Sequence, residues 1–70
     1  MKGTIKNQTY KLRTKSKITQ EALAEALGVT RQTIIAIEKG NYTPSVILAL
    51  KLAKFFKKSV ENIFQIKYEK

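Results

Sequence analysis

The sequence predicts a small all-α protein that forms one domain over residues 1–70. Apolar residues recur at three- and four-residue spacing in several segments, as they do along the buried face of a helix. Capping residues, glycine and proline separate these segments from one another. With 43% apolar residues among 70, the chain has the material for one small core and no more. We place that core within residues 7–64.

The first predicted helix covers residues 7–15. Tyr10 and Leu12 are among its few large apolar residues. Thr9 and Thr14 lower the helical propensity of the segment, so the sequence defines its ends poorly.

A second helix is predicted for residues 20–27. One face of this helix is apolar and consists of Ala22, Leu23, Ala26 and Leu27. Thr19 precedes the segment as an N-cap, and Ala24 leaves room for the close approach of a neighbouring helix. Gly28 ends the helix, because glycine adopts the left-handed C-terminal conformation at little cost.

A third helix follows a tight turn and covers residues 31–38. Thr30 caps its start, and Ile34 and Ile37 form its buried side. The residues that lie near its start and away from the core are Arg31, Gln32, Thr33, Ile35 and Ala36. A polar helix start held against a rigid partner helix is the geometry of a helix-turn-helix that reads the DNA major groove. We therefore predict such a motif over residues 20–38.

The longest apolar stretch, residues 46–56, predicts the central core helix, which Pro44 and Ser45 precede. Its predicted core stripe consists of Val46, Ile47, Leu50, Ala53 and Phe56. Ser59 caps a short last helix over residues 60–64.

The last predicted element is a strand, because residues 65–68 alternate polar and apolar side chains. Thr4 and Ile5, near the other end of the chain, can pair with it in a small two-stranded sheet. The alternative is a frayed tail.

The composition excludes most enzymatic and metal chemistry. The sequence has no cysteine and no histidine, which removes disulfides, the usual general base and the commonest metal ligands. The five acidic residues show no predicted inward-facing pair, and no glycine-rich loop is present to bind a phosphate. We therefore expect no enzymatic activity, no metal and no cofactor, and no small-molecule effector is evident.

The charge of the chain favours a polyanionic partner such as nucleic acid, since the formal net charge is +9 and the pI is about 10.1. The alternative explanation of this charge is a solvated, lysine-rich surface. No apolar run approaches membrane-spanning length, and the first residues lack the hydrophobic core of a signal peptide. We therefore expect a cytoplasmic protein with no membrane partner.

Several segments together resemble the Cro/cI-like helix-turn-helix regulators, also called the xenobiotic-response-element family. The matching segments include ITQEALA (18–24), LGVTRQTI (27–34), IEKG (37–40), YTPS (42–45), LALKLA (48–53) and SVENIF (59–64). Within this family the chain is most similar to small single-domain repressors of the cytolysin-repressor type. The resemblance implies a five-helix fold, binding of double-stranded DNA, and a homodimer formed through the C-terminal part of the chain.

We predict that the exposed start of the third helix reads bases. Gln32 can both donate to and accept from the edge of adenine, and Arg31 can bond guanine bidentately or hold a phosphate. Thr33 can bond a phosphate or contact a thymine methyl group. Ile35 stands where family members often have a small or polar residue, and with Ala36 it can contact thymine methyl groups. The alternative for Ile35 is a partly buried position at the rim.

A second group of residues is predicted to contact the sugar-phosphate backbone, namely Gln20, Lys39, Asn41, Tyr42 and Thr43. Gln20 lies at the start of the second helix, where free backbone N–H groups favour a phosphate. By resemblance its side chain contacts the DNA backbone and braces Gln32. The alternatives are an ordinary first-turn residue for Gln20 and a solvated loop for the others.

The resemblance also implies a structural ion pair between Arg13 and Glu38, which orients the recognition helix without using Arg13 as a DNA contact. A dimer interface is predicted because so small a core leaves surplus apolar surface. Its candidate residues are Phe55, Val60, Ile63 and Phe64. The alternative is that these residues belong to the monomer core.

These predictions together describe a sequence-specific repressor that binds a pseudo-palindromic operator as a homodimer. The alternative is a protein-interaction module on the same fold, such as an antitoxin or an adaptor. The polar side chains of Gln20, Arg31, Gln32 and Asn41 argue against that alternative, because a converted surface would be expected to lose them.

Overall fold

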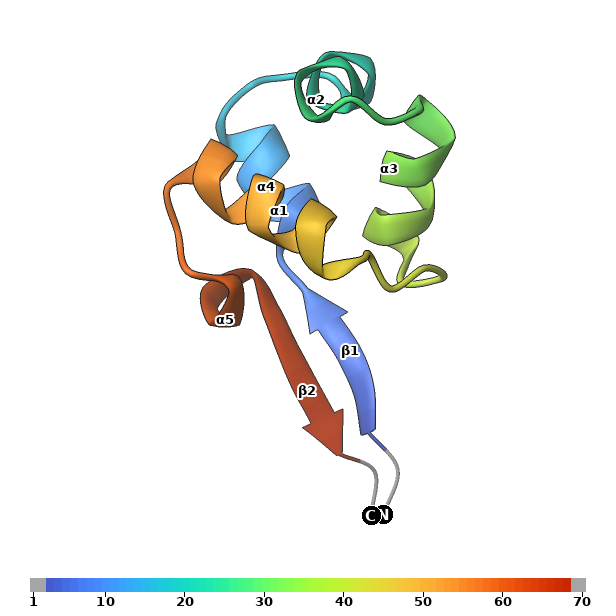
Figure 1. Ribbon diagram of the computed structural model, residues 1–70, viewed down its shortest axis with the longest axis vertical. Helices are drawn as coiled ribbons and strands as arrows, with labels where there is room; N and C mark the ends of the chain where they lie inside the picture. The colour runs from blue at the N-terminus through green and yellow to red at the C-terminus, as the bar shows by residue number, and fades with distance from the viewer. Residues whose placement is uncertain (1–2, 69–70) are drawn as a thin grey trace.

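The computed structural model describes residues 3–68 of the chain. Within these residues five helices form the body, and one strand near each end pairs in an antiparallel sheet that projects from it (Figure 1). The elements in chain order are β1 (Gly3–Asn7), α1 (Thr9–Lys15), α2 (Gln20–Leu27), α3 (Arg31–Lys39), α4 (Val46–Phe56), α5 (Val60–Ile63) and β2 (Phe64–Tyr68). The predicted five-helix fold and the predicted sheet are both confirmed, so the alternative of a frayed tail is wrong.

The two strands form a ribbon with one apolar face. Antiparallel pairing places Ile5 opposite Ile66, and Tyr68 shares their face because residues two apart in a strand point to the same side. Lys6 and Lys67 lie on the opposite face. Ile5, Ile66 and Tyr68 are all exposed, so the monomer leaves the apolar face of the ribbon uncovered.

Side-chain caps begin four of the helices. The capping hydroxyls, each of which accepts a hydrogen bond from a backbone N–H three residues later, belong to Thr19, Thr30, Ser45 and Ser59. The caps predicted at Thr19, Thr30 and Ser59 are therefore confirmed. The first helix begins later than expected, at Thr9, because Asn7 belongs to β1 and its side-chain Oδ1 accepts the N–H of Thr9 at 3.1 Å.

Residues in the left-handed conformation end three of the helices. Gly28 ends α2 with a φ of 73°, and Gly40 ends α3 with a φ of 79°. Lys57 ends α4 in the same conformation with a φ of 56°, although it carries a side chain. Because a Cβ makes this conformation costly, the two glycines fit their positions and Lys57 does so at a conformational cost.

Replacing Gly28 with alanine is expected to lower the free energy of unfolding by about 1–2 kcal/mol, the cost of a Cβ in the left-handed region. Apart from Gly28 itself and its two neighbours in the chain, no atom lies within 4 Å of the position that the new Cβ would take, so the cost is conformational and not steric. The matched control is Lys57→Gly, which should raise the free energy of unfolding by a similar amount. Urea unfolding of both variants measures the effect, and a Gly28→Ala midpoint equal to that of the parent protein would contradict it.

The core is built from three apolar residues of α2, two each of α3 and α4, and one of α5. Its buried members are Leu23, Ala24, Leu27, Ile34, Ile37, Leu48, Leu52 and Ile63. The predicted burial of Ile34 and Ile37 is confirmed, and both have no exposed surface. This core fixes α3 against α2, which leaves the outer side of α3 facing solvent.

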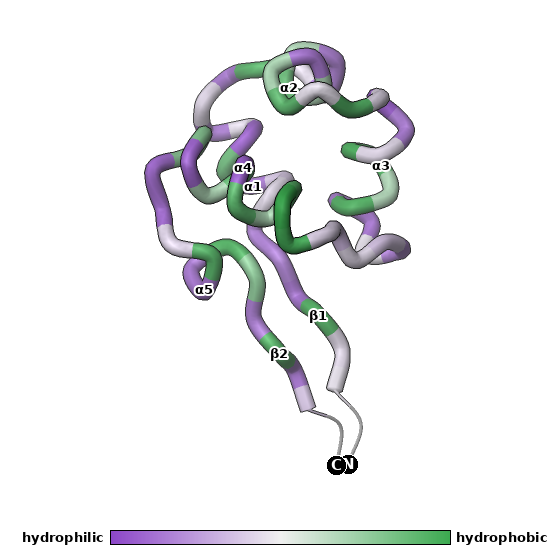
Figure 2. Tube along the Cα trace, in the orientation of Figure 1, coloured by the Kyte–Doolittle hydropathy of each residue, from purple (hydrophilic) through white to green (hydrophobic). Residues whose placement is uncertain are grey.

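The predicted core stripe of α4 is wrong in its first half. Val46, Ile47 and Leu50 are 76%, 68% and 53% exposed, whereas Leu48 and Leu52 are buried. Figure 2 shows that α4 is apolar along much of its length, so its sequence offers two overlapping apolar faces to the core. Helical spacing alone does not decide between two such faces.

A smaller correction applies to α2. Ala22 and Ala26 are exposed, and the buried face consists instead of Leu23, Ala24 and Leu27. Ala24, which was predicted to leave room for a neighbouring helix, is buried. The two leucines therefore set the orientation of this helix, because the alanine methyl groups offer much less apolar area to bury.

Thr9 is the one polar residue that is completely buried within residues 3–68, and its hydroxyl has no hydrogen-bond partner there. Replacing Thr9 with valine keeps the shape of the side chain and removes the unpartnered hydroxyl. The free energy of unfolding should rise by about 1 kcal/mol. The control Thr9→Ser keeps the hydroxyl, loses the methyl group and should lower the free energy of unfolding. Denaturant titration of the parent and both variants measures these changes. A Thr9→Val variant less stable than the parent would contradict a destabilising effect of the unpartnered hydroxyl.

Candidate nucleic-acid interface

The first part of the candidate site is the helix-turn-helix formed by α2 and α3. Gly28 turns the chain, and the N–H of Val29 donates to the carbonyl of Ala24 at 2.9 Å. Val29 itself is half-buried against the core. Leu23 and Leu27 of α2 pack in the same core as the buried isoleucines of α3, so the two helices form one rigid unit. The helix-turn-helix predicted for residues 20–38 is therefore present.

The start of α3 carries the residues predicted to read bases. Arg31 and Gln32 are exposed, while Thr33, Ile35 and Ala36 are half-buried. The Thr33 hydroxyl lies 3.1 Å from the Thr30 hydroxyl, so the cap of the helix already holds it. Ile35 is less exposed than its helical position suggested. The side chains with the most freedom to reach outward from this helix start are therefore those of Arg31 and Gln32.

Residues of α3 and of the loop that follows it share one surface hollow. Its lining consists of Gln32, Thr33, Ala36, Asn41 and Tyr42. The loop reaches this position because the N–H groups of Gly40 and Asn41 bond the carbonyls of Ile37 and Ala36, which folds the chain back on the end of α3. The structure thus brings predicted base-reading residues beside predicted backbone-contacting residues. Lys39 and Thr43 belong to the same predicted backbone-contacting group. Both are exposed, and both lie close to Asn41 and Tyr42 in the sequence.

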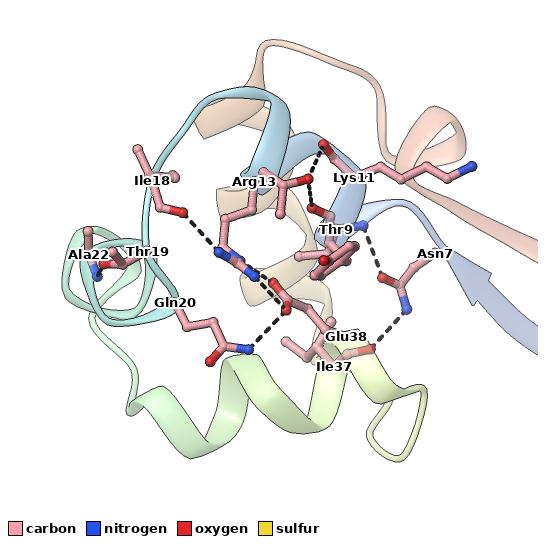
Figure 3. Close-up of polar contacts among 12 residues, drawn as sticks. Asn7, Thr9, Lys11, Arg13, Ile18, Thr19, Gln20, Ala22, Ile37 and Glu38 are labelled. Carbon is pink, nitrogen blue, oxygen red and sulfur yellow. Dashed lines mark hydrogen bonds and ion pairs between the residues drawn. The ribbon is translucent and has the colours of Figure 1, made fainter.

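A buried ion pair joins α1 to the end of α3. Arg13 Nε donates to Glu38 Oε2 at 2.6 Å, and Arg13 Nη2 donates to Glu38 Oε1 at 3.2 Å (Figure 3). Only 11% of the Arg13 side chain and 5% of the Glu38 side chain are exposed. The hydrogen bond to Glu38 raises the pKa of Arg13 above its ordinary value. The predicted pair is therefore present, and it is largely buried.

Gln20 belongs to the same network. Its Nε2 donates to Glu38 Oε1 at 3.1 Å, so one carboxylate oxygen accepts from both Arg13 and Gln20. The side-chain amide nitrogen of Gln20 is thus directed to Glu38. This hydrogen bond differs from the contact to Gln32 that the resemblance implied. Gln20 and Arg31 line a common polar hollow with Arg13, Thr19 and Glu21.

Asn7 positions α3, a role that the sequence did not predict. Its Nδ2 donates to the carbonyl of Ile37 at 3.0 Å, and its Oδ1 accepts the N–H of Thr9 (Figure 3). One side chain at the end of β1 therefore joins the start of α1 to the last turn of α3. The asparagine two residues before a helix start is a signal for the contact to Thr9, but no sequence pattern indicates the contact to Ile37.

One of the predicted dimer residues lies elsewhere than expected. Ile63 is completely buried in the monomer core, so its prediction as an interface residue is wrong. The short helix α5 turns this side chain inward, where it packs with the leucines of α4. Phe64 and Val60 are half-buried, whereas Phe55 is 41% exposed and stacks edge-to-face on Phe56.

The chain matches the model of the helix-turn-helix family over residues 10–63. It is 48% identical over 65 residues to the uncharacterized HTH-type transcriptional regulator YgzD of Bacillus subtilis, covering 93% of this chain and 98% of that protein. It is 57% identical over 60 residues to an uncharacterized HTH-type transcriptional regulator of Methanocaldococcus jannaschii, covering 86% of this chain and 91% of that protein.

The fold is also that of a solved structure, the restriction-modification controller protein C.AhdI from Aeromonas hydrophila. The two share a TM-score of 0.72 and 29% sequence identity over 79% of this chain and 83% of C.AhdI. In the part of the chain that the structure describes, no helix is long and apolar enough to cross a membrane. The family match, the named relatives and the fold agree: the chain belongs to the Cro/cI-like helix-turn-helix family of DNA-binding transcriptional regulators, whose members are not enzymes.

Proposed function

We propose that this protein is a cytoplasmic, sequence-specific repressor that binds a pseudo-palindromic DNA operator as a homodimer. The observation that carries the proposal is the exposed start of α3, where Arg31 and Gln32 extend from a helix that a buried core holds against α2. This end of α3 enters the major groove, and α2 lies across the DNA backbone. A dimer bound over a promoter in this way would exclude the transcription machinery.

Side chains on the exposed face of α3 contact the bases. Gln32 bonds the N6 and N7 groups of adenine, and Arg31 bonds O6 and N7 of guanine. The methyl groups of Thr33 and Ala36 and the side chain of Ile35 face thymine methyl groups, since the Thr33 hydroxyl is already held by Thr30. Half-buried side chains of this kind add shape complementarity to the two polar contacts.

Backbone contacts come from the segment that follows α3. Lys39, Asn41, Tyr42 and Thr43 are all exposed there, and Asn41 and Tyr42 share a hollow with Gln32. These contacts set the register of the protein on the duplex and give the binding its dependence on salt. The net charge of +9 supports the same partner.

The proposed homodimer covers apolar surface that the monomer leaves exposed. Val46, Ile47 and Leu50 on α4 form one such surface, and Ile5, Ile66 and Tyr68 on the ribbon form another. Phe55, Val60 and Phe64 remain candidate interface residues because each keeps some exposed surface. So many exposed apolar side chains on a chain of 70 residues favour a partner of the same kind.

Selection of bound duplexes from a random DNA pool at near-physiological salt tests this proposal. An enriched inverted repeat with half-sites about 34 Å apart would support a dimeric operator-binding protein. A single enriched half-site would support base readout but contradict the dimer. Binding without sequence enrichment that disappears as salt rises would contradict the proposal and favour a protein-interaction module.

Gln32→Ala is expected to weaken binding to the selected operator by about 1–3 kcal/mol and to relax the preference at one base position. Lys39→Ala, the matched control, should weaken binding to operator and random DNA about equally, because it contacts only phosphate. Fluorescence anisotropy on both duplexes compares the variants. Equal losses on both DNAs for Gln32→Ala would rule out its role in base readout.

A further inference from the structure

One face of α4 combines apolar side chains with lysines. Its apolar part consists of Ile47 and Leu50, which are exposed, and Ala53, which is half-buried. A groove of about 700 Å³ follows this face from α4 to α5. Its lining consists of Ile47, Leu50, Lys51, Ala53, Lys54, Lys57, Lys58, Ser59 and Asn62, and we call it the lysine groove.

Helical spacing explains why these side chains form one line. Ile47, Lys51 and Lys54 follow one another at four- and three-residue intervals, so they lie on one side of α4. The helix then ends, and Lys57 in its left-handed conformation turns the chain so that Lys57 and Lys58 line the same groove. α4 has 11 residues and is therefore about 16 Å long, which lets a partner helix of about three turns lie along it.

The charges of the lysine groove have little compensation within the chain. The Lys51 ammonium donates to the carbonyl of Leu27, at the end of α2, at 3.4 Å. The described residues form a single ion pair, which joins α1 to α3 and does not reach the groove. Hence no carboxylate in residues 3–68 pairs with the other three lysines. Their alternative role is to offset the negative C-terminal end of α4, a role that leaves the apolar side chains beside them unused.

A second copy of this chain is an imperfect occupant of the lysine groove. In a two-fold dimer each copy presents the same surface, so the lysines of both copies face one another. The apolar side chains favour that contact and the lysines oppose it. DNA supplies negative charge, but it offers little apolar surface to cover Ile47 and Leu50. A protein segment with both acidic and apolar side chains meets both requirements of the groove.

From this geometry we propose that the lysine groove binds an acidic amphipathic helix of another protein. The apolar side of that helix covers Ile47 and Leu50, and its carboxylates pair with Lys54 and Lys58. Because the same surface carries the proposed dimer contact, the partner displaces the second copy and releases the operator. The inference rests on the proposed function and deepens it, since it names the chemistry of a protein that would regulate the dimer.

Selection of peptides from a random display library tests the groove without DNA. The library uses peptides of about 16 residues, the length of about four helical turns. We expect the enriched sequences to carry Glu or Asp beside apolar residues at three- and four-residue spacing, and their binding to weaken as salt rises. Their NMR chemical-shift changes should map to the lysine groove. No enrichment, enrichment of sequences without acidic residues, or binding mapped to another surface would overturn the proposal.

Two charge-reversed variants separate the groove from the net charge of the protein. Lys54→Glu/Lys58→Glu should lower the affinity for a selected peptide about tenfold, because it replaces two attractive contacts with repulsive ones. The matched control Lys11→Glu/Lys15→Glu changes two exposed lysines with the same spacing on α1, and it should stay within about twofold of the parent protein. Lys54→Gln/Lys58→Gln, which should give a smaller loss, keeps the test valid if the reversed variant does not fold.

Two results of this comparison would overturn the proposal. Equal losses in both charge-reversed variants would mean that the peptide follows net charge alone. A Lys54→Glu/Lys58→Glu protein that keeps its peptide affinity but binds a single DNA half-site more weakly than the control would assign these lysines to DNA.

The dimer measurement separates the inference from the proposed function. Sedimentation of the parent protein with a selected peptide should show dissociation of the dimer, and the affinity for the operator should fall with it. A peptide that maps to the lysine groove while the dimer persists would contradict the competition and place the dimer interface elsewhere. A protein that is monomeric without peptide would contradict the proposed dimer and its regulation, whereas peptide binding would still decide whether the groove takes an acidic helix.

Discussion

Glu38→Ala is expected to lower the free energy of unfolding by about 3–5 kcal/mol, because it leaves the Arg13 guanidinium buried without its partner. Only 11% of the Arg13 side chain is exposed, and two of its hydrogen bonds end on Glu38. A third bond, from Nη1 to the carbonyl of Ile18 at 2.9 Å, keeps the guanidinium inside after the carboxylate is removed. A domain of this size has a total stability of about 4–10 kcal/mol, so the variant should be partly unfolded at 37 °C.

The double variant Arg13→Met/Glu38→Leu is the control for this experiment. It replaces the ion pair with apolar side chains of similar volume, and such replacements are often neutral or stabilising. Urea unfolding of the parent, both single variants and the double variant gives the coupling between the two positions. If the double variant loses as much free energy of unfolding as the two single variants together, the two side chains act independently. That result would contradict an unpaired buried charge as the cause of the destabilisation.

The same double variant shows whether stability and DNA binding depend on the ion pair in the same way. The double variant should recover the fold, but it lacks the carboxylate that orients Gln20. The affinity for DNA should therefore stay below that of the parent protein when stability returns, because Gln20 is a predicted DNA-contacting residue. The buried pair is thus expected to serve the orientation of the DNA-binding surface more than the net stability of the domain.

The parts of the fold that the sequence predicted correctly depend on local chemistry. Thr19, Thr30 and Ser59 cap helices because their hydroxyl groups accept hydrogen bonds from residues three positions later. Gly28 ends α2 for an equally local reason, its tolerance of a positive φ. The Arg13–Glu38 pair is a long-range contact, and it was expected only because the family resemblance implied it.

The parts that could not be predicted depend on which surfaces meet. In α4 the residues Leu48 and Leu52 are buried and Ile47 and Leu50 are not, although both pairs are apolar. Ile63 fills the core because the chain turns after Lys57, which adopts the left-handed conformation usually given to glycine. Asn7 reaches Ile37 only because the strand from the start of the chain ends beside α3. Each of these facts is set by tertiary packing, which local spacing does not encode.

Leu50→Asp is expected to make the protein monomeric and to lower its affinity for the full operator by about 10²–10⁴-fold, because two linked half-sites would no longer be bound together. Leu50 is 53% exposed, so a charge at this position can remain hydrated in the monomer and the fold should persist. The same charge in a dimer interface would be desolvated without a partner. Affinity for a single half-site should stay within about twofold of the parent protein, since the change removes only the second binding event.

The charge around this surface gives a second test of the same dimer. Ile47 and Leu50 line one groove with Lys51, Lys54, Lys57 and Lys58, and a two-fold axis at this groove brings the lysines of both copies toward each other. Like charges are screened by salt, so the dimer should become tighter as salt rises, whereas DNA binding becomes weaker. Sedimentation at two salt concentrations, with Leu50→Met as the conservative variant, measures the association. A Leu50→Asp protein that remains dimeric would place the interface elsewhere, and a monomeric one with full operator affinity would show that the dimer is not needed for binding.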